Sequence, residues 1–199
     1  MNRRFRRLSL AALLAVPVAA FSTAALAHVG DHSHMTFAEG LSHPFTGVDH
    51  MLAMVAVGLW ASQLGRRAMV LLPLLFPAVM AIGATIGVSG PDMPWVEIGI
   101  AASVLVLGAA VAFALRPSLA VSAALIAVFA LLHGYSHGVE LPASVSGLTF
   151  GIGFVAATLV LHTIGIAIGL AANRVPVRHM AQVAGGAIAA AGVLLLVMS

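Results

Sequence analysis

Histidines and carboxylates gather in two short motifs of this 199-residue chain. The first holds His43, Asp49 and His50, and the second runs from His133 through His137 to Glu140. On a helix, the spacing of the second motif predicts that its two imidazoles and its carboxylate project from one face. Neutral imidazole with carboxylate suits borderline divalent ions such as Ni²⁺, Co²⁺ and Zn²⁺. The six residues are therefore candidate metal ligands.

Two geometries are open for the first motif. In a continuous helix, His43 and His50 are seven residues apart and share a face two turns apart. Pro44 favours a helix start instead, which would leave His43 at a cap or in an irregular stretch that folds back toward His50. In both geometries Asp49 needs a cationic partner, since a lone carboxylate at membrane depth costs up to about 2.5–3.5 kcal/mol.

Other histidines extend the pattern. His162 lies within an apolar stretch, where it is either a second station on an ion path, a proton acceptor or an interhelical hydrogen-bonding group. A short His-rich tract near the N-terminus is a candidate for weak metal capture. Its members are His28, His32 and His34.

The elements that must position these groups are membrane helices. Hydrophobic residues make up 61% of the chain and charged residues only 8%, which excludes a soluble globular protein. Stretches long enough to span a bilayer occur at about 45–64, 68–88, 95–115, 118–138, 144–172 and 179–198. We therefore predict an all-α integral membrane protein with six transmembrane helices. Glycine pairs at i, i+4 in three of them predict close helix packing: Gly83 with Gly87, Gly147 with Gly151 and Gly165 with Gly169.

A secretory leader is expected ahead of these helices. Four arginines lie between residues 3 and 7, an apolar run follows, and Ala25-Leu26-Ala27 has the small residues of a cleavage site. We predict a signal peptide over 1–27, a short His-rich periplasmic segment over 28–44 and a transporter domain over 45–199; the alternative is an uncleaved first helix. Cleavage leaves five arginines against six acids, so the basic composition does not indicate nucleic-acid binding.

The remaining charges predict the orientation. With the mature N-terminus outside, the five arginines fall in cytoplasmic connections and the six acids on the opposite side, as the positive-inside rule requires. Both mature termini are then expected in the periplasm, and the protein itself in the inner membrane of a bacterium. The arginines are Arg66, Arg67, Arg116, Arg174 and Arg178. This topology brings both His/acid motifs to the outer mouth.

The two motifs carry a family resemblance. The stretch from His43 to Ala61, the stretch from His133 to Glu140 and the surroundings of His162 resemble the HupE/UreJ family of nickel/cobalt permeases. The resemblance implies import of Ni²⁺, with Co²⁺ as the alternative, to supply hydrogenase, urease or cobalamin synthesis. The metal is then the substrate, and no permanent cofactor is expected. The chain has no cysteine and no nucleotide-binding motif, so we expect neither thiolate ligands nor ATP hydrolysis by this chain.

Two other classes stay open. An intramembrane zinc hydrolase would use the same residue types, in a fixed three-ligand site with an open water position beside a lipid-sized cavity. A periplasmic metal sensor would need a larger soluble surface than the short connections supply. If the protein is a transporter, we expect its ligands to be spread along a path toward His162.

Overall fold

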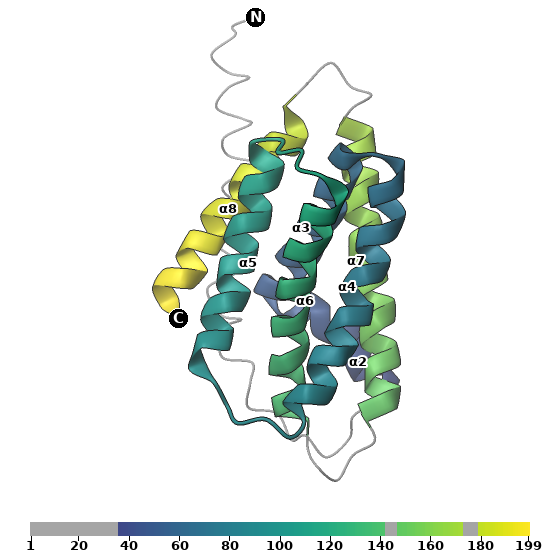
Figure 1. The fold of residues 1–199 in the computed structure, drawn as a ribbon, viewed down its shortest axis with the longest axis vertical. Coiled ribbons are helices and arrows are strands. Elements are labelled where there is room, and N and C mark those ends of the chain that lie inside the picture. Colours follow the sequence, from purple (N-terminus) through teal and green to yellow (C-terminus); the bar gives the residue numbers. More distant parts are fainter. Residues whose placement is uncertain (1–35, 142–146, 173–178) are drawn as a thin grey trace, which may run out of the picture. The chain divides into compact units, whose positions relative to one another are not determined.

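The computed structural model describes residues 36–141, 147–172 and 179–199, which all belong to one packing unit. Within these ranges the chain forms α-helices and no strands (Figure 1). The helices are α2 (Phe37–Thr46), α3 (Val48–Leu64), α4 (Arg66–Gly87), α5 (Pro94–Ala112), α6 (Leu119–Glu140), α7 (Gly147–Ala172) and α8 (Met180–Met198). The predicted leader and the His-rich tract at 28–34 lie outside the described residues.

Local sequence signals set the helix boundaries. At the start of α2, the hydroxyl of Thr36 accepts from the backbone N–H of Glu39, and the carboxylate of Glu39 accepts from the backbone N–H of Thr36. This reciprocal pair is a capping box. Gly65 separates α3 from α4 with φ +105°, a conformation that favours glycine. Pro94 occupies the first turn of α5, and the hydroxyl of Ser118 accepts from the N–H of Val121 at the start of α6. These caps explain why such apolar stretches break into separate helices.

The first predicted span is a broken helix. α2 and α3 meet at Gly47 with a bend of 83°. Of the described helices, five are long and apolar enough to cross a membrane, or six when α2 and α3 together count as one span. The all-helical membrane fold is thus confirmed, but α2 begins before the boundary expected at residue 45. His43 lies in the last turn of α2, which is neither the continuous helix nor the irregular stretch considered above.

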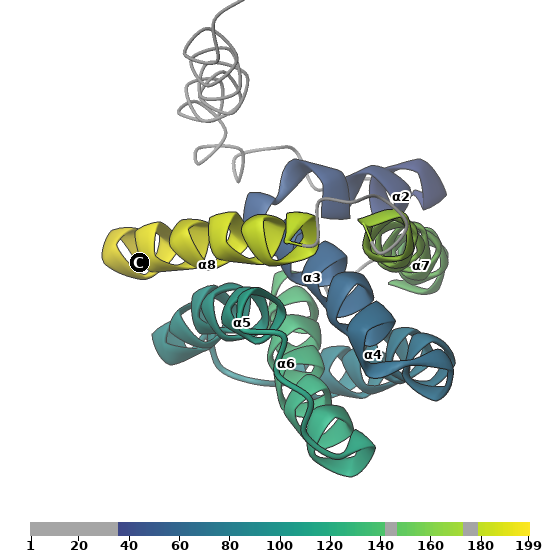
Figure 2. The same ribbon diagram turned by 90° about the horizontal axis from the view of Figure 1, so that it is seen from above.

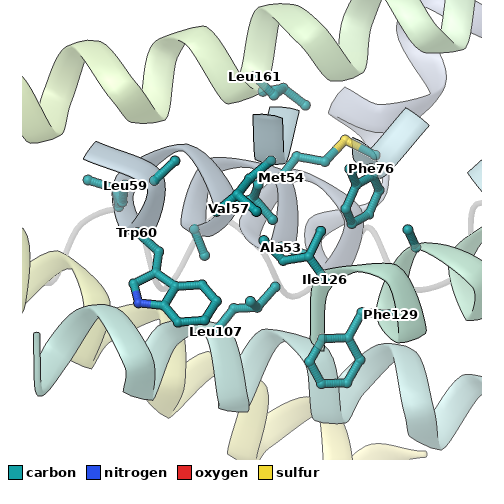
Figure 3. Packing of buried hydrophobic residues seen from close by; sticks show 14 of the residues in the cluster. Ala53, Met54, Val57, Leu59, Trp60, Phe76, Leu107, Ile126, Phe129 and Leu161 are labelled. Carbon is teal, nitrogen blue, oxygen red and sulfur yellow. The ribbon is translucent and has the colours of Figure 1, made fainter. Parts of the chain in front are cut away.

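Helix α3 occupies the centre of this unit. It contacts each of the other six described helices, and Figure 2 shows it surrounded by them. Its own Met54 and Trp60 are fully buried, and so are Phe76, Leu107 and Ile126 of the neighbouring helices (Figure 3). Large apolar side chains remain exposed on the outer helices, as expected where lipid replaces water. The site residues near the start of α3 therefore face the interior of the protein.

Close glycine contacts join several of the helices in pairs. α4 and α6 approach so closely that a Cβ atom on Gly83 or on Gly134 would collide with the backbone of the other helix. α3 and α7 meet in the same way at Gly58 and Gly165. Two of the three predicted glycine pairs are thus confirmed, whereas Gly151 has nothing within 4 Å of where a Cβ would lie. A Cβ on Gly147 would meet only the side chain of Leu141, so among the described residues this pair makes no close contact between helix backbones.

Candidate metal site

The two motifs converge at one end of the helix group. His43 comes from α2, His50 from α3, and His133 and His137 from α6. The ring centroids of His43 and His137 are 4.9 Å apart, those of His137 and His50 are 4.6 Å apart, and those of His50 and His133 are 5.0 Å apart. Four imidazoles thus form a continuous series of neighbouring rings.

Asp49 fixes the orientation of His50. Its Oδ1 atom lies 2.7 Å from Nδ1 of His50 and also accepts from the backbone N–H of His50 at 2.8 Å. Because a carboxylate only accepts, Nδ1 of the imidazole carries the proton and donates. In the neutral ring Nε2 of His50 keeps its lone pair, and this atom is buried without a hydrogen-bond partner. This is the carboxylate–histidine arrangement that prepares an imidazole for a metal.

His133 is held in the same tautomer by a different group. Its Nδ1 atom donates to the carbonyl of Phe129, one turn earlier on α6, at 2.9 Å. The ring is fully buried, and Nε2 has no partner. A buried imidazole nitrogen without a hydrogen bond is unfavourable unless something binds it. His133 therefore presents a second free lone pair to the interior.

A carboxylate completes the exposed end of the series. His43, His137 and Glu140 each offer a ligand atom, and these atoms lie within 4.8 Å of one another. Nδ1 of His137 is 3.6 Å from Oε2 of Glu140, while Nε2 of His137 is buried without a partner. Glu140 itself is exposed and His43 is half-buried, so this trio is the part of the site that water reaches.

The series continues inward through an aromatic ring. The ring centroid of Phe76, on α4, is 5.5 Å from that of His133 and 5.4 Å from that of His162, on α7. Both Phe76 and His162 are fully buried. The structure thus brings five of the predicted histidines into one sequence of ring contacts, with Phe76 between the fourth and the fifth.

Some groups around the site were not identified from the sequence. Glu97, in the first turn of α5, accepts from the hydroxyl of Ser136 at 2.9 Å, beside His137 on α6. Phe154 of α7 contacts His43 and His137 with ring centroids 5.6 and 4.6 Å away. Neither Glu97 nor Phe154 lies in a His-rich motif, so only the helix packing reveals their position.

Comparisons with known proteins identify the family of the chain. The sequence pattern of the family described as HupE / UreJ protein matches residues 15–195. Protein HupE of Rhizobium leguminosarum bv. viciae is 47% identical over 180 residues, which cover 89% of this chain and 93% of that protein. No solved structure matches the chain. The match over nearly the whole length shows that the chain belongs to the HupE/UreJ family.

Proposed function

We propose that this protein is a permease that imports a divalent transition metal ion, Ni²⁺ or Co²⁺, through a His/carboxylate site. The observation that carries the proposal is the continuous series of imidazoles from His43 to His133, three of which have a buried Nε2 without a partner. Imidazole nitrogen and carboxylate oxygen are donors that Ni²⁺ and Co²⁺ accept. Membership of the HupE/UreJ family supports the same conclusion.

The residues of the site divide into three roles. Glu140, His43 and His137 take the ion from water, because they lie at the end of the series where Glu140 is exposed and His43 is half-buried. His50 and His133 receive it at greater depth through Nε2. Asp49 orients the imidazole of His50 by accepting its Nδ1 proton in a hydrogen bond. Its negative charge also offsets the positive charge of the ion. For the tail histidines we propose weak capture ahead of this site; they are His28, His32 and His34.

Transport needs release as well as binding. A site of imidazoles and carboxylates without thiolates exchanges its ion more readily than a closed cysteine site. An inside-negative membrane potential favours inward movement of a dication by about 4.6 kcal/mol per 100 mV. Entry driven by the potential or by a coupled ion is therefore sufficient, and the proposed mechanism has no catalytic residue and no resident cofactor.

The alternative function, an intramembrane zinc hydrolase, is less well supported. A hydrolase needs one fixed three-ligand site with an open water position. The trio of His43, His137 and Glu140 is only one end of a longer series, because the described rings continue from the half-buried His43 to the fully buried His162. A graded series suits an ion path better than a closed catalytic site.

We propose that the histidine motifs face the periplasm, in the inner membrane, with both mature termini on that side. The start of α4 and the connection before α6 lie at the upper end in Figure 1, and they carry Arg66, Arg67 and Arg116. The start of α5 and the end of α6 lie at the lower end, and they carry Glu97 and Glu140. The positive-inside rule then assigns the arginine end to the cytoplasm.

The orientation can be tested by thiol labelling, because the chain has no cysteine. Ser89 and Ser118 are exposed and lie in opposite connections. In intact spheroplasts, a membrane-impermeant maleimide should label the Ser89→Cys protein, and should label the Ser118→Cys protein only after the membrane is opened. Labelling in the reverse order would contradict the proposed orientation.

The function can be tested in proteoliposomes loaded with a metal-sensitive dye. The parent protein should admit Ni²⁺ and Co²⁺ when an inside-negative potential is imposed, and the His50→Ala and His137→Ala proteins should not. The Ser103→Ala protein is the matched control, because that buried hydroxyl bonds only to the Ile100 carbonyl of its own helix. If the parent admits neither metal, or if both alanine variants match it, the proposed transport site is wrong.

A further inference from the structure

The hydroxyl of Thr158, on α7, differs from the other buried hydroxyls of the described residues. Those of Ser62, Ser103 and Ser122 each donate to a carbonyl of the preceding turn, and that of Ser136 donates to Glu97. Thr158 is fully buried, yet its Oγ1 atom has no hydrogen-bond partner. A threonine in a helix normally bonds to the carbonyl three or four residues earlier. The free hydroxyl therefore needs another explanation.

His162 lies one turn further along α7, and its ring also lacks a hydrogen bond of good geometry. It follows Thr158 by four residues, so the two side chains lie on one face of α7. Its ring is fully buried, and neither Nδ1 nor Nε2 makes a hydrogen bond. The carbonyl of Pro73 is close enough to this ring to act as a weak hydrogen-bond acceptor, although the contact lacks the geometry of a full hydrogen bond. That carbonyl is available because Pro77, four residues later on α4, has no N–H to donate to it.

The packing of α7 fixes where these groups lie. At Gly165 the helix approaches α3 so closely that a Cβ atom would collide with the carbonyl of Val55. The ring of Phe76, from α4, contacts the other side of His162. The unpartnered atoms are thus enclosed among α3, α4 and α7 with no access to water. Buried polar groups without hydrogen bonds are rare and unfavourable, and a missing ligand is one of their few explanations.

We propose that Thr158 and His162 form a second, deeper binding station for the divalent metal ion. The inference rests on the proposed transport function and extends it. The station offers imidazole nitrogen, hydroxyl oxygen and the Pro73 carbonyl, and no carboxylate, so it binds a dication more weakly than the outer site. Weak binding at this depth favours onward release. Ni²⁺ or Co²⁺ is the kind of ion that imidazole nitrogen with neutral oxygen donors suits.

Phe76 separates the two stations. Its ring contacts His133 on the outer side and His162 on the inner side, and it is fully buried. An ion that passes from Nε2 of His133 to His162 must displace this ring. The outer and the deeper stations are therefore not open to one another while Phe76 keeps this position.

Substitutions at Thr158 test the station with little change in packing. Thr158→Val keeps the shape and removes the hydroxyl, and Thr158→Ser keeps the hydroxyl. Thr163→Val is the matched control on the same helix, because that exposed hydroxyl bonds to the carbonyl of Leu159. In the proteoliposome assay we expect Thr158→Val to lower the initial Co²⁺ flux about tenfold. This is the lower end of the loss of activity seen when a group around a bound metal is removed. The Thr158→Ser and Thr163→Val proteins should stay near the parent.

A binding measurement separates the two stations. Purified protein is titrated with Co²⁺ and followed by visible absorption. Thr158→Val and His162→Gln should leave the dissociation constant of the outer site unchanged. In a His50→Ala/His137→Ala background, the weak residual Co²⁺ binding should disappear when His162→Gln is added.

The outcomes distinguish the possible failures. If the parent admits no metal, the proposed function fails, while residual Co²⁺ binding that depends on His162 still supports the station. If Thr158→Val and His162→Gln carry Co²⁺ like the parent while His50→Ala does not, the outer site stands and the deeper station is wrong. An equal loss of flux in the Thr158→Val, Thr158→Ser and Thr163→Val proteins would indicate a structural role of this face and would also overturn the station.

Discussion

The α4–α6 pair and the α5–α8 pair are built in the same way and differ in chemistry. In both pairs a glycine lets two backbones touch: Gly134 would collide with Met80 of α4 if it had a Cβ atom, and Gly108 would collide with Ala189 of α8. α6 buries His133 and His137 beside its glycines, whereas the buried residues of α8 are only alanine, glycine and isoleucine. Close helix contact is therefore scaffolding, and unpartnered polar atoms indicate function.

The largest effect should come from removing imidazoles from the site beside the α4–α6 pair. His50→Ala and His137→Ala should each lower metal flux at least about a hundredfold, since even outer-shell partners of metal ligands contribute about 10- to 100-fold. The double variant should be hardly worse than either single one, because both residues serve the same ion. Flux measured at matched protein density in liposomes checks this. Additive losses in the double variant would indicate two independent sites and break the comparison.

A smaller and graded effect is expected at Asp49. If this carboxylate orients His50, then Asp49→Asn, whose amide oxygen still accepts from Nδ1, should lower flux about tenfold, and Asp49→Ala should lower it about a hundredfold. Asp92→Asn, an exposed change of the same kind, is the control and should have little effect. The measurement is again initial flux of Ni²⁺ or Co²⁺. Equal and complete loss in both Asp49 variants would instead make the carboxylate a direct ligand.

The smallest effect on flux is expected at the glycine contacts. Gly108→Ala and Gly134→Ala should each reduce stability by about 1–3 kcal/mol, because the added methyl group overpacks a backbone contact. Thermal unfolding in detergent would detect both losses. Gly108→Ala should leave the flux per folded molecule unchanged, whereas Gly134→Ala should lower it severalfold, since it displaces the neighbouring His133. If Gly108→Ala lowers flux as much, the two pairs are not functionally distinct.

Sequence reasoning could predict most of the fold and the members of the site, but not their geometry. Hydropathy and helix breakers predict the helices, because each membrane helix satisfies its own backbone hydrogen bonds. The bend at Gly47 escaped prediction, since a glycine after Thr46 is compatible with either a break or a continuous helix. The position of His43 in a separate short helix follows from that bend.

The internal order of the site also needed three-dimensional packing. Phe76 lies between His133 and His162 only because α4 packs against both α6 and α7. The unpartnered hydroxyl of Thr158 has no signal in the sequence, where it is one of many small polar residues in apolar helices. The spacing from Thr158 to His162, four residues on one face, is the one clue that could have suggested their association.

The hydrogen bond from His133 to the carbonyl of Phe129 affects whether protons could cross the membrane along the imidazoles. Proton hopping along imidazoles requires each ring to accept a proton at one nitrogen and to pass one on from the other. Nδ1 of His133 donates to a backbone carbonyl, which cannot take up a proton and hand it forward. Protons that reach this ring are stopped there, while a metal ion needs only the lone pair of Nε2. In the proposed mechanism, the histidine that passes the metal would therefore also limit a leak of protons.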